Sequence, residues 1–375
     1  MVGAYSGIFG EYPFDKYGMT AIVPFEYGGM EHQTITTLNR HLFTYERLVA
    51  HELAHQWWGD LVTCGTWPDV WLNESFATYS EALWQESKGG KAALRDYMKD
   101  SLEHFNFLSW TGAVYDPVSQ GFNLLDDVVY SKGAWVLHSL RGVIGDSAFF
   151  QTLRTYRSMY EQKNATTEEF LAVLDTVTNV RMRWFFDQWV YGRGWPQYAL
   201  RFGWRQDTLS LTIYQQQDVS CPTYLMPLHV RAFHGTDSTT FVVWDSLRIQ
   251  RFSIPLSAAP DKVVLDPDDW VLKQIVDAPN GVAGDKLPET FVLDQNYPNP
   301  FNPLTHIGYR IPLSGWVSLR VFDLLGREVA TLTDEKSGPG EYTVPFDGQN
   351  LPSGVYVYQL RVGDRTVSRR MVLMK

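Results

Sequence analysis

Residues 48–58 read LVAHELAHQWW and place two histidines, His51 and His55, four positions apart, with Glu52 beside the first. On a helix of 3.6 residues per turn, side chains four positions apart lie about 40° apart, so both imidazole rings can face one metal ion. Glu52 is then close enough to face the same ion without binding it. The stretch therefore predicts a helix that carries two metal ligands and a general base.

Eighteen residues separate His55 from Glu74, which leaves room for one turn back and the start of a second helix that carries Glu74. Two histidines and one glutamate leave the fourth position of a zinc ion open for water, as in catalytic sites. The bare motif also occurs in exposed helical turns that bind nothing. The apolar neighbours in residues 48–58 and 71–77 argue against that alternative, because buried polar side chains cost several kcal/mol unless something compensates them.

Four motifs occur in the order found in a known family. HELAHQWWGD followed by WLNESFATYSE resembles the zinc aminopeptidase family that includes alanyl aminopeptidase and leukotriene hydrolase, gluzincins with a thermolysin-like catalytic domain. Upstream, Gly28–His32 is similar to the family's substrate-binding GAMEN segment. Downstream, Val129–Ala134 matches the segment with the catalytic tyrosine, and residues 185–196 resemble the end of the helical part. The resemblance covers roughly the first 200 residues.

This resemblance implies a role for each polar group. His51, His55 and Glu74 would hold one zinc ion per chain, which lowers the pKa of a bound water toward neutrality. Glu52 would take a proton from that water as it attacks the scissile carbonyl, and pass it to the departing amine. Tyr130 would stabilise the developing oxyanion. A core aromatic is the alternative for Tyr130, because the chain has 20 tyrosines.

Glu31 separates an exopeptidase from an endopeptidase in this interpretation. A carboxylate at the end of a cleft can bind a free α-ammonium group and so fix which bond is cut. In the family the matching glutamate does this, while the backbone at the positions of Gly28 and Gly29 binds the peptide. The segment departs from GAMEN at Gly29 and His32, and these changes leave the acid in place. The alternative is an ordinary surface acid in a glycine-rich turn.

Four other side chains near the ligands in the sequence are not assigned a role at the metal. A carboxylate commonly orients a metal-bound histidine, and Asp60, Asp69 and Glu81 are the acids in range. The sequence does not choose among them, and each one alone is expected to be a solvated side chain or a helix cap. Cys64 is interpreted as a buried small residue, because the ligand set is complete without it. With Cys221 as the other cysteine, no disulfide framework is expected.

The composition limits the classes of partner. The balance of 32 basic and 42 acidic residues gives a net charge of −10, which argues against nucleic acid. No run of 18 apolar residues predicts a membrane span. The first residues do not resemble a signal peptide and match an internal segment of the family. Relatives carry a β-rich domain before this point, so the chain is expected to be an N-terminally truncated fragment.

Periodicity divides the chain. Helical patterns run from about Leu38 to Trp195, and strands with period two follow. The expected fold is multidomain: a mainly α thermolysin-like zinc peptidase domain, a small β-sandwich, and a C-terminal immunoglobulin-like β-sandwich. The expected boundaries are residues 1–197, 198–277, 278–290 for a Pro/Gly-rich linker, and 291–375.

The last part has its own motifs. NYPNPFNP begins at Asn296, alternating strands follow, and the chain ends in RRMVLMK. This tail resembles the C-terminal sorting domain of the bacterial type IX secretion system. The resemblance implies the type IX secretion machinery as a partner, and a secreted or cell-surface location in a bacterium. The alternative is a generic β-sandwich adhesion module.

Together these features predict a secreted zinc metallopeptidase that removes N-terminal amino acids from peptides with a free N-terminus. Two alternatives stay open, a gluzincin endopeptidase and an inactive zinc-containing surface binding protein. Glu31 argues against the first alternative. The intact pair Glu52 and Tyr130 argues against the second, because an idle scaffold does not need a base.

Overall fold

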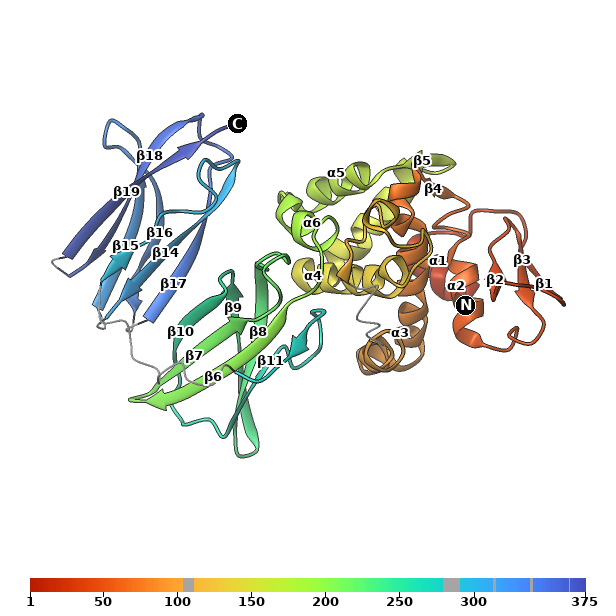
Figure 1. Cartoon of the computed structure of the whole chain (residues 1–375), viewed down its shortest axis with the longest axis horizontal. Helices are drawn as coiled ribbons and strands as arrows, with labels where there is room; N and C mark the ends of the chain where they lie inside the picture. The colour runs from red at the N-terminus through yellow and green to blue at the C-terminus, as the bar shows by residue number, and fades with distance from the viewer. Residues whose placement is uncertain (104–110, 279–290, 313–314, 338–339, 364) are drawn as a thin grey trace. The chain divides into compact units, whose positions relative to one another are not determined.

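The computed structural model describes residues 1–103, 111–278, 291–312, 315–337, 340–363 and 365–375, and contains both helices and many strands (Figure 1). The chain divides into two compact units. The first unit comprises Met1–Pro196, Gln217–Thr223 and Asp268–Gln274, and the second comprises Gln197–Gln216, Tyr224–Pro267 and Ile275–Lys375. All of the predicted site residues belong to the first unit.

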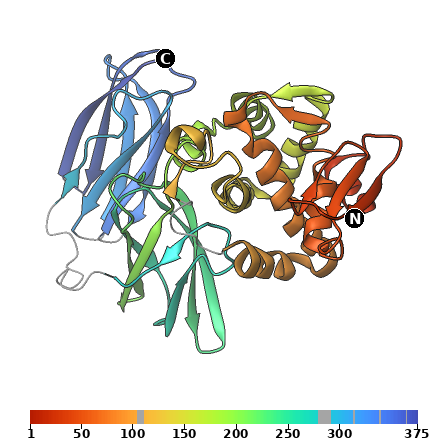
Figure 2. The ribbon, with the colours of Figure 1, turned by 45° about the vertical axis from the view of Figure 1, so that its right-hand side comes forward.

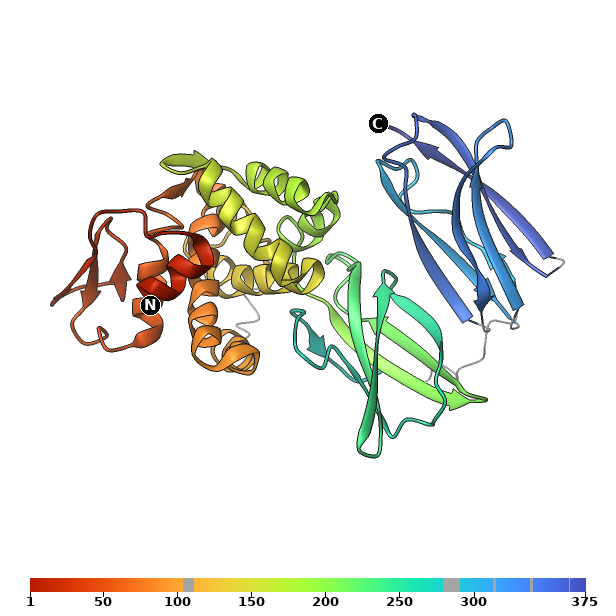
Figure 3. The ribbon, with the colours of Figure 1, turned by 180° about the vertical axis from the view of Figure 1, so that it is seen from behind.

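Helices carry most of the first unit. They are α1 (Val2–Phe9), α2 (Glu46–Ala54), η1 (Trp67–Asp69), α3 (Trp71–Leu102), η3 (Val118–Gln120), the π-helix η4 (Val128–Lys132), α4 (Gly133–Met159), α5 (Thr167–Thr178) and α6 (Arg183–Trp189). The strands are β1 (Gly18–Ile22), β2 (Gly29–Met30), β3 (Ile35–Asn39), β4 (Val62–Cys64) and β5 (Lys163–Ala165). α3 packs against both α2 and α4 (Figures 2 and 3).

The predicted start of the helical region is wrong. Leu38 lies in β3, the central strand of the sheet β1-β3-β2, where it is buried at 1% exposure, and α2 begins only at Glu46. A single buried leucine in a short strand does not produce a period that tells a strand from a helix. Two glycines interrupt the long helices, since Gly90 and Gly145 leave helical geometry with φ of 69° and 80° inside α3 and α4.

Aromatic side chains fill the core behind α2 and α3. The Phe76 ring on α3 lies 5.2 Å from the Phe170 ring on α5, edge to face, and Trp58 stacks on Tyr156 of α4 at 6.1 Å. Such pairs bury large apolar areas and fix the angle at which neighbouring helices meet. The core therefore holds α2 and α3 in one arrangement.

The second unit consists of strands in the ranges that the structure describes. They are β6 (Gln197–Arg205), β7 (Thr208–Gln215), β8 (Met226–His234), β9 (Asp237–Asp245), β10 (Ile249–Pro255), β11 (Lys262–Leu265), β12 (Gln274–Ile275), β13 (Val292–Leu293), β14 (Leu304–Ile311), β15 (Gly315–Phe322), β16 (Glu328–Ser337), β17 (Gly340–Asp347), β18 (Gly354–Val362) and β19 (Arg365–Leu373). Their sheets have the orders β10-β7-β6-β12, β11-β8-β9, β13-β14-β17 and β16-β15-β18-β19. The strands predicted from period-two patterns are confirmed by β7, β8, β9, β11, β15 and β18.

One apolar core joins the last two sheets. Alternate side chains of β14, β15 and β18 are buried, as the burial pattern of β14 shows from Thr305 to Ile311. Ile307, Leu319 and Leu360 in this core have no exposed surface. The predicted linker at residues 278–290 lies outside the described residues, apart from Ala278. No helix within the described ranges has the length and hydropathy needed to cross a membrane.

Candidate active site

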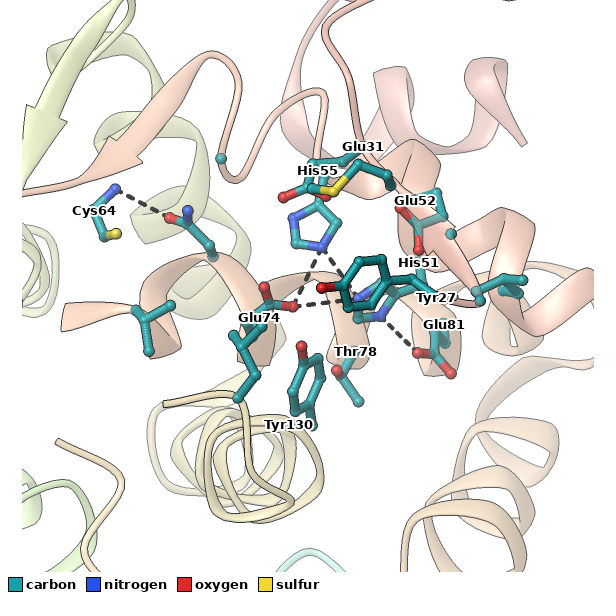
Figure 4. A pocket seen from close by; sticks show the side chains of 18 of the residues that line it. Tyr27, Glu31, His51, Glu52, His55, Cys64, Glu74, Thr78, Glu81 and Tyr130 are labelled. Carbon is teal, nitrogen blue, oxygen red and sulfur yellow. Dashed lines mark hydrogen bonds and ion pairs between the residues drawn. The ribbon is translucent and has the colours of Figure 1, made fainter. Parts of the chain in front are cut away.

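Two neighbouring helices bring the predicted metal ligands together. His51 lies in the last turn of α2, His55 follows the end of that helix directly, and Glu74 lies in the first turn of α3 (Figure 4). The side chains beside the histidines on α2, Ala50 and Leu53, are buried in the core. Burial of one face of α2 therefore turns both imidazole rings toward α3.

The three ligand atoms are spaced as a metal ion requires. The Nε2 atoms of His51 and His55 are 3.1 Å apart, and each lies 3.4 Å from Oε2 of Glu74. Ligand atoms of a tetrahedral zinc site with bonds of about 2.0–2.1 Å lie about 3.3 Å apart. Among the described residues these three side chains form a group that could hold a metal ion. Two imidazoles and one carboxylate are donors that zinc prefers, so the site fits this ion.

Charges at the site favour a cation between the ligands. Burial acts to lower the pKa of His55, but the Glu74 carboxylate overcomes this effect and raises that pKa to about 9. The pKa of His51 is also raised well above its usual value, against burial, by Glu74 and Glu81. Burial acts to raise the pKa of Glu74, yet the two histidines lower it. A divalent cation would satisfy the same electrostatic preference.

Each histidine is oriented through its second ring nitrogen. Nδ1 of His51 lies 2.8 Å from Oε1 of Glu81, and Nδ1 of His55 lies 2.9 Å from the carbonyl oxygen of Trp58. These acceptors place the proton on Nδ1 and leave the Nε2 lone pairs facing Glu74. Glu81 also accepts bonds from Arg47 Nε at 2.7 Å and from the Tyr97 hydroxyl at 2.5 Å. This network of a half-exposed arginine and a tyrosine thus fixes the buried carboxylate that orients His51.

Of the three acids that the sequence left open, Glu81 is therefore the one that orients a ligand histidine. The expectation that Glu81 is solvated is wrong. Asp69 is also buried, and its Oδ1 accepts a bond from the backbone nitrogen of Thr167 at 2.8 Å, where α5 begins. Asp60 accepts a bond from Gln56 at 2.7 Å, and burial raises its pKa to about 7. Neither of these two carboxylates bonds to the ring of a ligand histidine.

Cys64 does not have the burial that the sequence suggested. Its side chain is half-buried at the edge of the pocket, and its backbone nitrogen bonds to Oδ1 of Asn73 at 3.1 Å. Burial raises the pKa of its thiol to about 11, so it is protonated near neutral pH. Cys64 and Cys221 are both free.

Glu52 is a buried acid without a full set of partners. Its residue is 5% exposed, and Oε2 has no hydrogen-bond partner among the described residues. Burial raises its pKa, His51 and His55 act against this effect, and Glu31 adds to it. A carboxylate beside the ligands with one oxygen unpaired can accept a proton.

The glycine-rich segment lies beside Glu52. β2 contains Gly29 and pairs with β3 at Leu38, and Glu31 follows directly after this strand. Nε2 of Gln56, on the turn after α2, donates a bond to the carbonyl oxygen of Glu31 at 3.1 Å. Figure 4 shows Glu31 and Glu52 on one side of the ligand set.

Tyr130 reaches the site from a π-helix. The single wide turn η4 places its ring 5.9 Å from the His51 ring at an interplanar angle of 29°. Burial raises the pKa of the Tyr130 phenol, and the negative charge of Glu74 raises it further, so the hydroxyl keeps its proton. Ser75 Oγ, beside Glu74, donates a bond to the carbonyl oxygen of Val129 at 2.5 Å, which ties η4 to α3. π-turns of this kind often occur at functional sites.

One pocket of about 1250 Å³ collects the predicted residues. All eight line it: Gly28, Gly29, Glu31, His51, Glu52, His55, Glu74 and Tyr130. Three exposed aromatic side chains at its rim were not expected from the sequence. They are Tyr27 (61% exposed), Tyr45 (61%) and Trp67 (69%). A pocket with an apolar rim and a polar floor is typical of a small-molecule or peptide site.

Helix spacing indicates part of the network around Glu81. Glu81 follows Glu74 by seven positions, two helical turns, so both acids lie on one face of α3. Arg47 precedes His51 by four positions on α2 and faces the same way. Tyr97 lies far along α3, and no spacing rule could have found it.

Two regions of the chain match known families. Residues 4–189 match the family described as "Peptidase family M1 domain", and residues 295–374 match "Secretion system C-terminal sorting domain". The chain is 31% identical over 203 residues to aminopeptidase N of Streptomyces lividans. This match covers 49% of this chain and 24% of that protein. It is 30% identical over 234 residues to aminopeptidase N of Haemonchus contortus. This match covers 54% of this chain and 24% of that protein. The chain thus spans about a quarter of the length of these curated relatives.

A solved structure shares the fold. Aminopeptidase A of Legionella pneumophila, in complex with aspartic acid, superposes with a TM-score of 0.61 at 17% identity. The match covers 73% of this chain and 33% of that chain. At this identity the likeness concerns the fold alone.

Proposed function

We propose that this chain, which carries a peptidase family M1 domain in residues 4–189, is a secreted zinc metallopeptidase that removes N-terminal amino acids from peptides. One observation carries the proposal. The ligand atoms of His51, His55 and Glu74 meet within zinc spacing, and the buried Glu52 carboxylate beside them has an unpaired oxygen. The similarity to proteins named aminopeptidase N supports the choice of an aminopeptidase.

The proposed mechanism assigns the proton transfers to Glu52. His51, His55 and Glu74 would hold one zinc ion per chain, and this ion would act as a Lewis acid and lower the pKa of a water bound to it. Glu52 accepts the proton that hydrolysis releases and returns it to the departing amine. Its burial supports this role, because a raised pKa keeps the protonated form accessible during turnover.

Tyr130 is proposed to donate a hydrogen bond to the oxygen of the scissile carbonyl as negative charge develops on it. Its protonated phenol and its place beside the His51 ring support this assignment. The bond from Ser75 to the carbonyl of Val129 holds the segment that carries Tyr130 against the helix of Glu74.

Glu31 is proposed to bind the free α-ammonium group of the peptide. Its side chain lines the pocket, and its backbone is held by Gln56. Backbone groups of Gly28 and Gly29 are proposed to contact the peptide next to it. A charge-assisted bond at one end of the pocket fixes the first peptide bond at the ligands, so one residue is removed at a time.

The zinc-loaded protein should therefore cleave a peptide with a free N-terminus and leave its N-acetylated form intact. Release of the first residue from both peptides is followed by mass spectrometry. Equal cleavage of both forms would favour an endopeptidase, and cleavage of neither would favour an inactive binding protein. Chelation should abolish turnover, and added zinc should restore it.

The remaining parts are proposed to act in export. The sorting-domain match indicates secretion or a cell-surface location, and we propose the type IX secretion machinery as the partner of residues 291–375. The proposed organisation is a thermolysin-like domain at 1–197, a small β-sandwich at 198–277, a linker at 278–290 and an immunoglobulin-like β-sandwich at 291–375. The shared core of the last two sheets supports the final assignment. Removal of residues 291–375 should leave the protein in the periplasm, as fractionation would show.

A further inference from the structure

Gln56 uses every hydrogen-bonding position of its side-chain amide. The residue lies on the turn after α2 and has no exposed surface. Its Oε1 accepts bonds from the backbone nitrogen of Thr34 at 2.9 Å and from the Tyr12 hydroxyl at 3.0 Å. Its Nε2 donates to the carbonyl oxygen of Glu31 at 3.1 Å and to Oδ2 of Asp60 at 2.7 Å. A primary amide has two hydrogens and two lone pairs, so all four are used.

These partners allow the amide only one orientation. Turned over, it would set its oxygen against the carbonyl oxygen of Glu31 and the Asp60 carboxylate, and its NH₂ group against the N–H of Thr34. Buried polar groups that face their own kind are left unpaired, which is costly. The Gln56 side chain is therefore a rigid link between the end of α2 and the segment 31–34.

The segment that Gln56 holds contains a turn that threonine seldom adopts. Thr34 has a φ of 68°. A β-branched residue with positive φ is strained, and such a conformation persists only where its surroundings hold it. Gln56 bonds to both ends of this turn, at the Glu31 carbonyl and the Thr34 nitrogen, and the Gly18 nitrogen bonds to the Thr34 carbonyl oxygen at 2.9 Å. Strained turns are common where a ligand is held.

The Glu31 carboxylate depends on this turn for its position. It lines the pocket, and in the part of the chain that the structure describes it has no hydrogen-bond or ion-pair partner. No other side chain fixes it, so the backbone of Glu31 decides where it lies. That backbone is bonded to Gln56, which directly follows the ligand His55.

We propose that Gln56 is a positioning residue for Glu31: it ties the strained turn 31–34 to the end of α2, and so sets the distance between the amine-binding carboxylate and the metal ligands. This inference rests on the proposed function for the role of Glu31. A peptide needs such a fixed distance, because its α-nitrogen and its first carbonyl carbon are two bonds apart, about 2.5 Å.

Gln56→Met is the direct test, because methionine has a similar volume and makes none of these bonds. Calorimetry in the zinc-loaded Glu52→Gln background measures binding without turnover. In that background trialanine should bind roughly 10-fold more tightly than N-acetyl-trialanine, since only the free form has an ammonium group for Glu31. With Gln56→Met added, the two affinities should agree within about twofold, because the carboxylate is no longer held in place.

Turnover gives a second readout. In the chain with Glu52 intact, Gln56→Met should lower kcat/KM for trialanine roughly 10- to 100-fold, because a displacement of about 1 Å can cost roughly 100-fold in rate. The zinc content should stay close to that of the wild type, since the ligand side chains lose no bond.

Gln250→Met is the matched control. Gln250 on β10 is also fully buried and also holds a turn, because its Oε1 accepts a bond from the Ser246 nitrogen at 2.7 Å and its Nε2 donates to the Trp244 carbonyl oxygen at 3.1 Å. Its loss should lower Tm and leave the preference for free trialanine unchanged. An equal loss of this preference in Gln250→Met and Gln56→Met would trace the effect to lower stability and overturn the proposal.

Gln56→Glu decides the matter if Gln56→Met does not fold. It keeps the shape and the acceptor for Thr34 and Tyr12, but its carboxylate cannot donate to Glu31 or Asp60, so it should also remove the preference. A folded Gln56 variant that still prefers free trialanine would overturn the inference alone. Equal binding of both tripeptides before any change at Gln56 would instead count against the proposed function.

Discussion

The metal site and the core of the last two sheets are both buried, but they are held in different ways. At the site, polar atoms have single named partners, such as Nδ1 of His51 with Glu81 and Nδ1 of His55 with the carbonyl of Trp58. In the sheets, Ile307, Leu319 and Leu360 share apolar neighbours, and none of them depends on one partner. Loss of one atom should therefore abolish the function of the site, whereas loss of several atoms in the core should cost only stability.

The sharpest way to break this comparison is Glu52→Gln, which replaces one oxygen and keeps the shape. The amide cannot accept the proton, so kcat for a free peptide should fall roughly 10³- to 10⁴-fold. Zinc content, by metal analysis, and Tm should stay close to those of the wild type. Turnover that survives this change would show that Glu52 is not the base.

Tyr130→Phe removes one hydroxyl from η4. If this phenol stabilises the developing oxyanion, its loss should lower kcat roughly 10²- to 10³-fold and change KM only slightly. The ring, which lies against His51, remains in place. An equal loss of kcat in Tyr115→Phe, a tyrosine outside the pocket lining, would mean that the hydroxyl of Tyr130 has no special role.

Glu81→Gln tests the orientation of a ligand and not the ligand itself. Without this carboxylate the Nδ1–H of His51 loses its charged acceptor, so zinc affinity should fall roughly 10- to 100-fold. Competition with a chromogenic chelator measures this change. Asp60→Asn is the matched control, because Asp60 lines the same pocket but its carboxylate accepts a bond from Gln56 and not from a ligand side chain. A similar loss of affinity in both variants would point to pocket charge as the cause.

The smallest effect on turnover is expected from the core of the sheets. Leu360→Ala on β18 removes a fully buried side chain and should cost about 2–5 kcal/mol of stability in this part of the chain. Calorimetry would show a lower Tm for one transition, while kcat of the folded protein stays the same. A matched change at an exposed site, Leu325→Ala, should cost little, since Leu325 is 79% exposed. A change in kcat with Leu360→Ala would contradict the separation of the two regions.

The same contrast explains what the sequence could predict. Period-two patterns located β7, β8, β15 and β18, because alternation alone decides which side chains enter a core. Helix geometry made His51 and His55 candidates for one metal ion, because residues four apart share a face. The spacing of Glu74 and Glu81 likewise puts both acids on one face of α3, but Glu81 becomes the neighbour of His51 only when α3 packs on α2.

The first helix has a consequence for engineering the site. The Tyr5 hydroxyl of α1 lies 3.1 Å from the carbonyl oxygen of Ala50 and 2.8 Å from that of Ser80, the residues just before His51 and Glu81. It therefore links the turn that carries His51 to the turn that carries Glu81, whose side chains bond to each other. Tyr5 does not line the pocket, so it offers a position from which the orientation of His51 could be tuned without touching any group that meets the substrate.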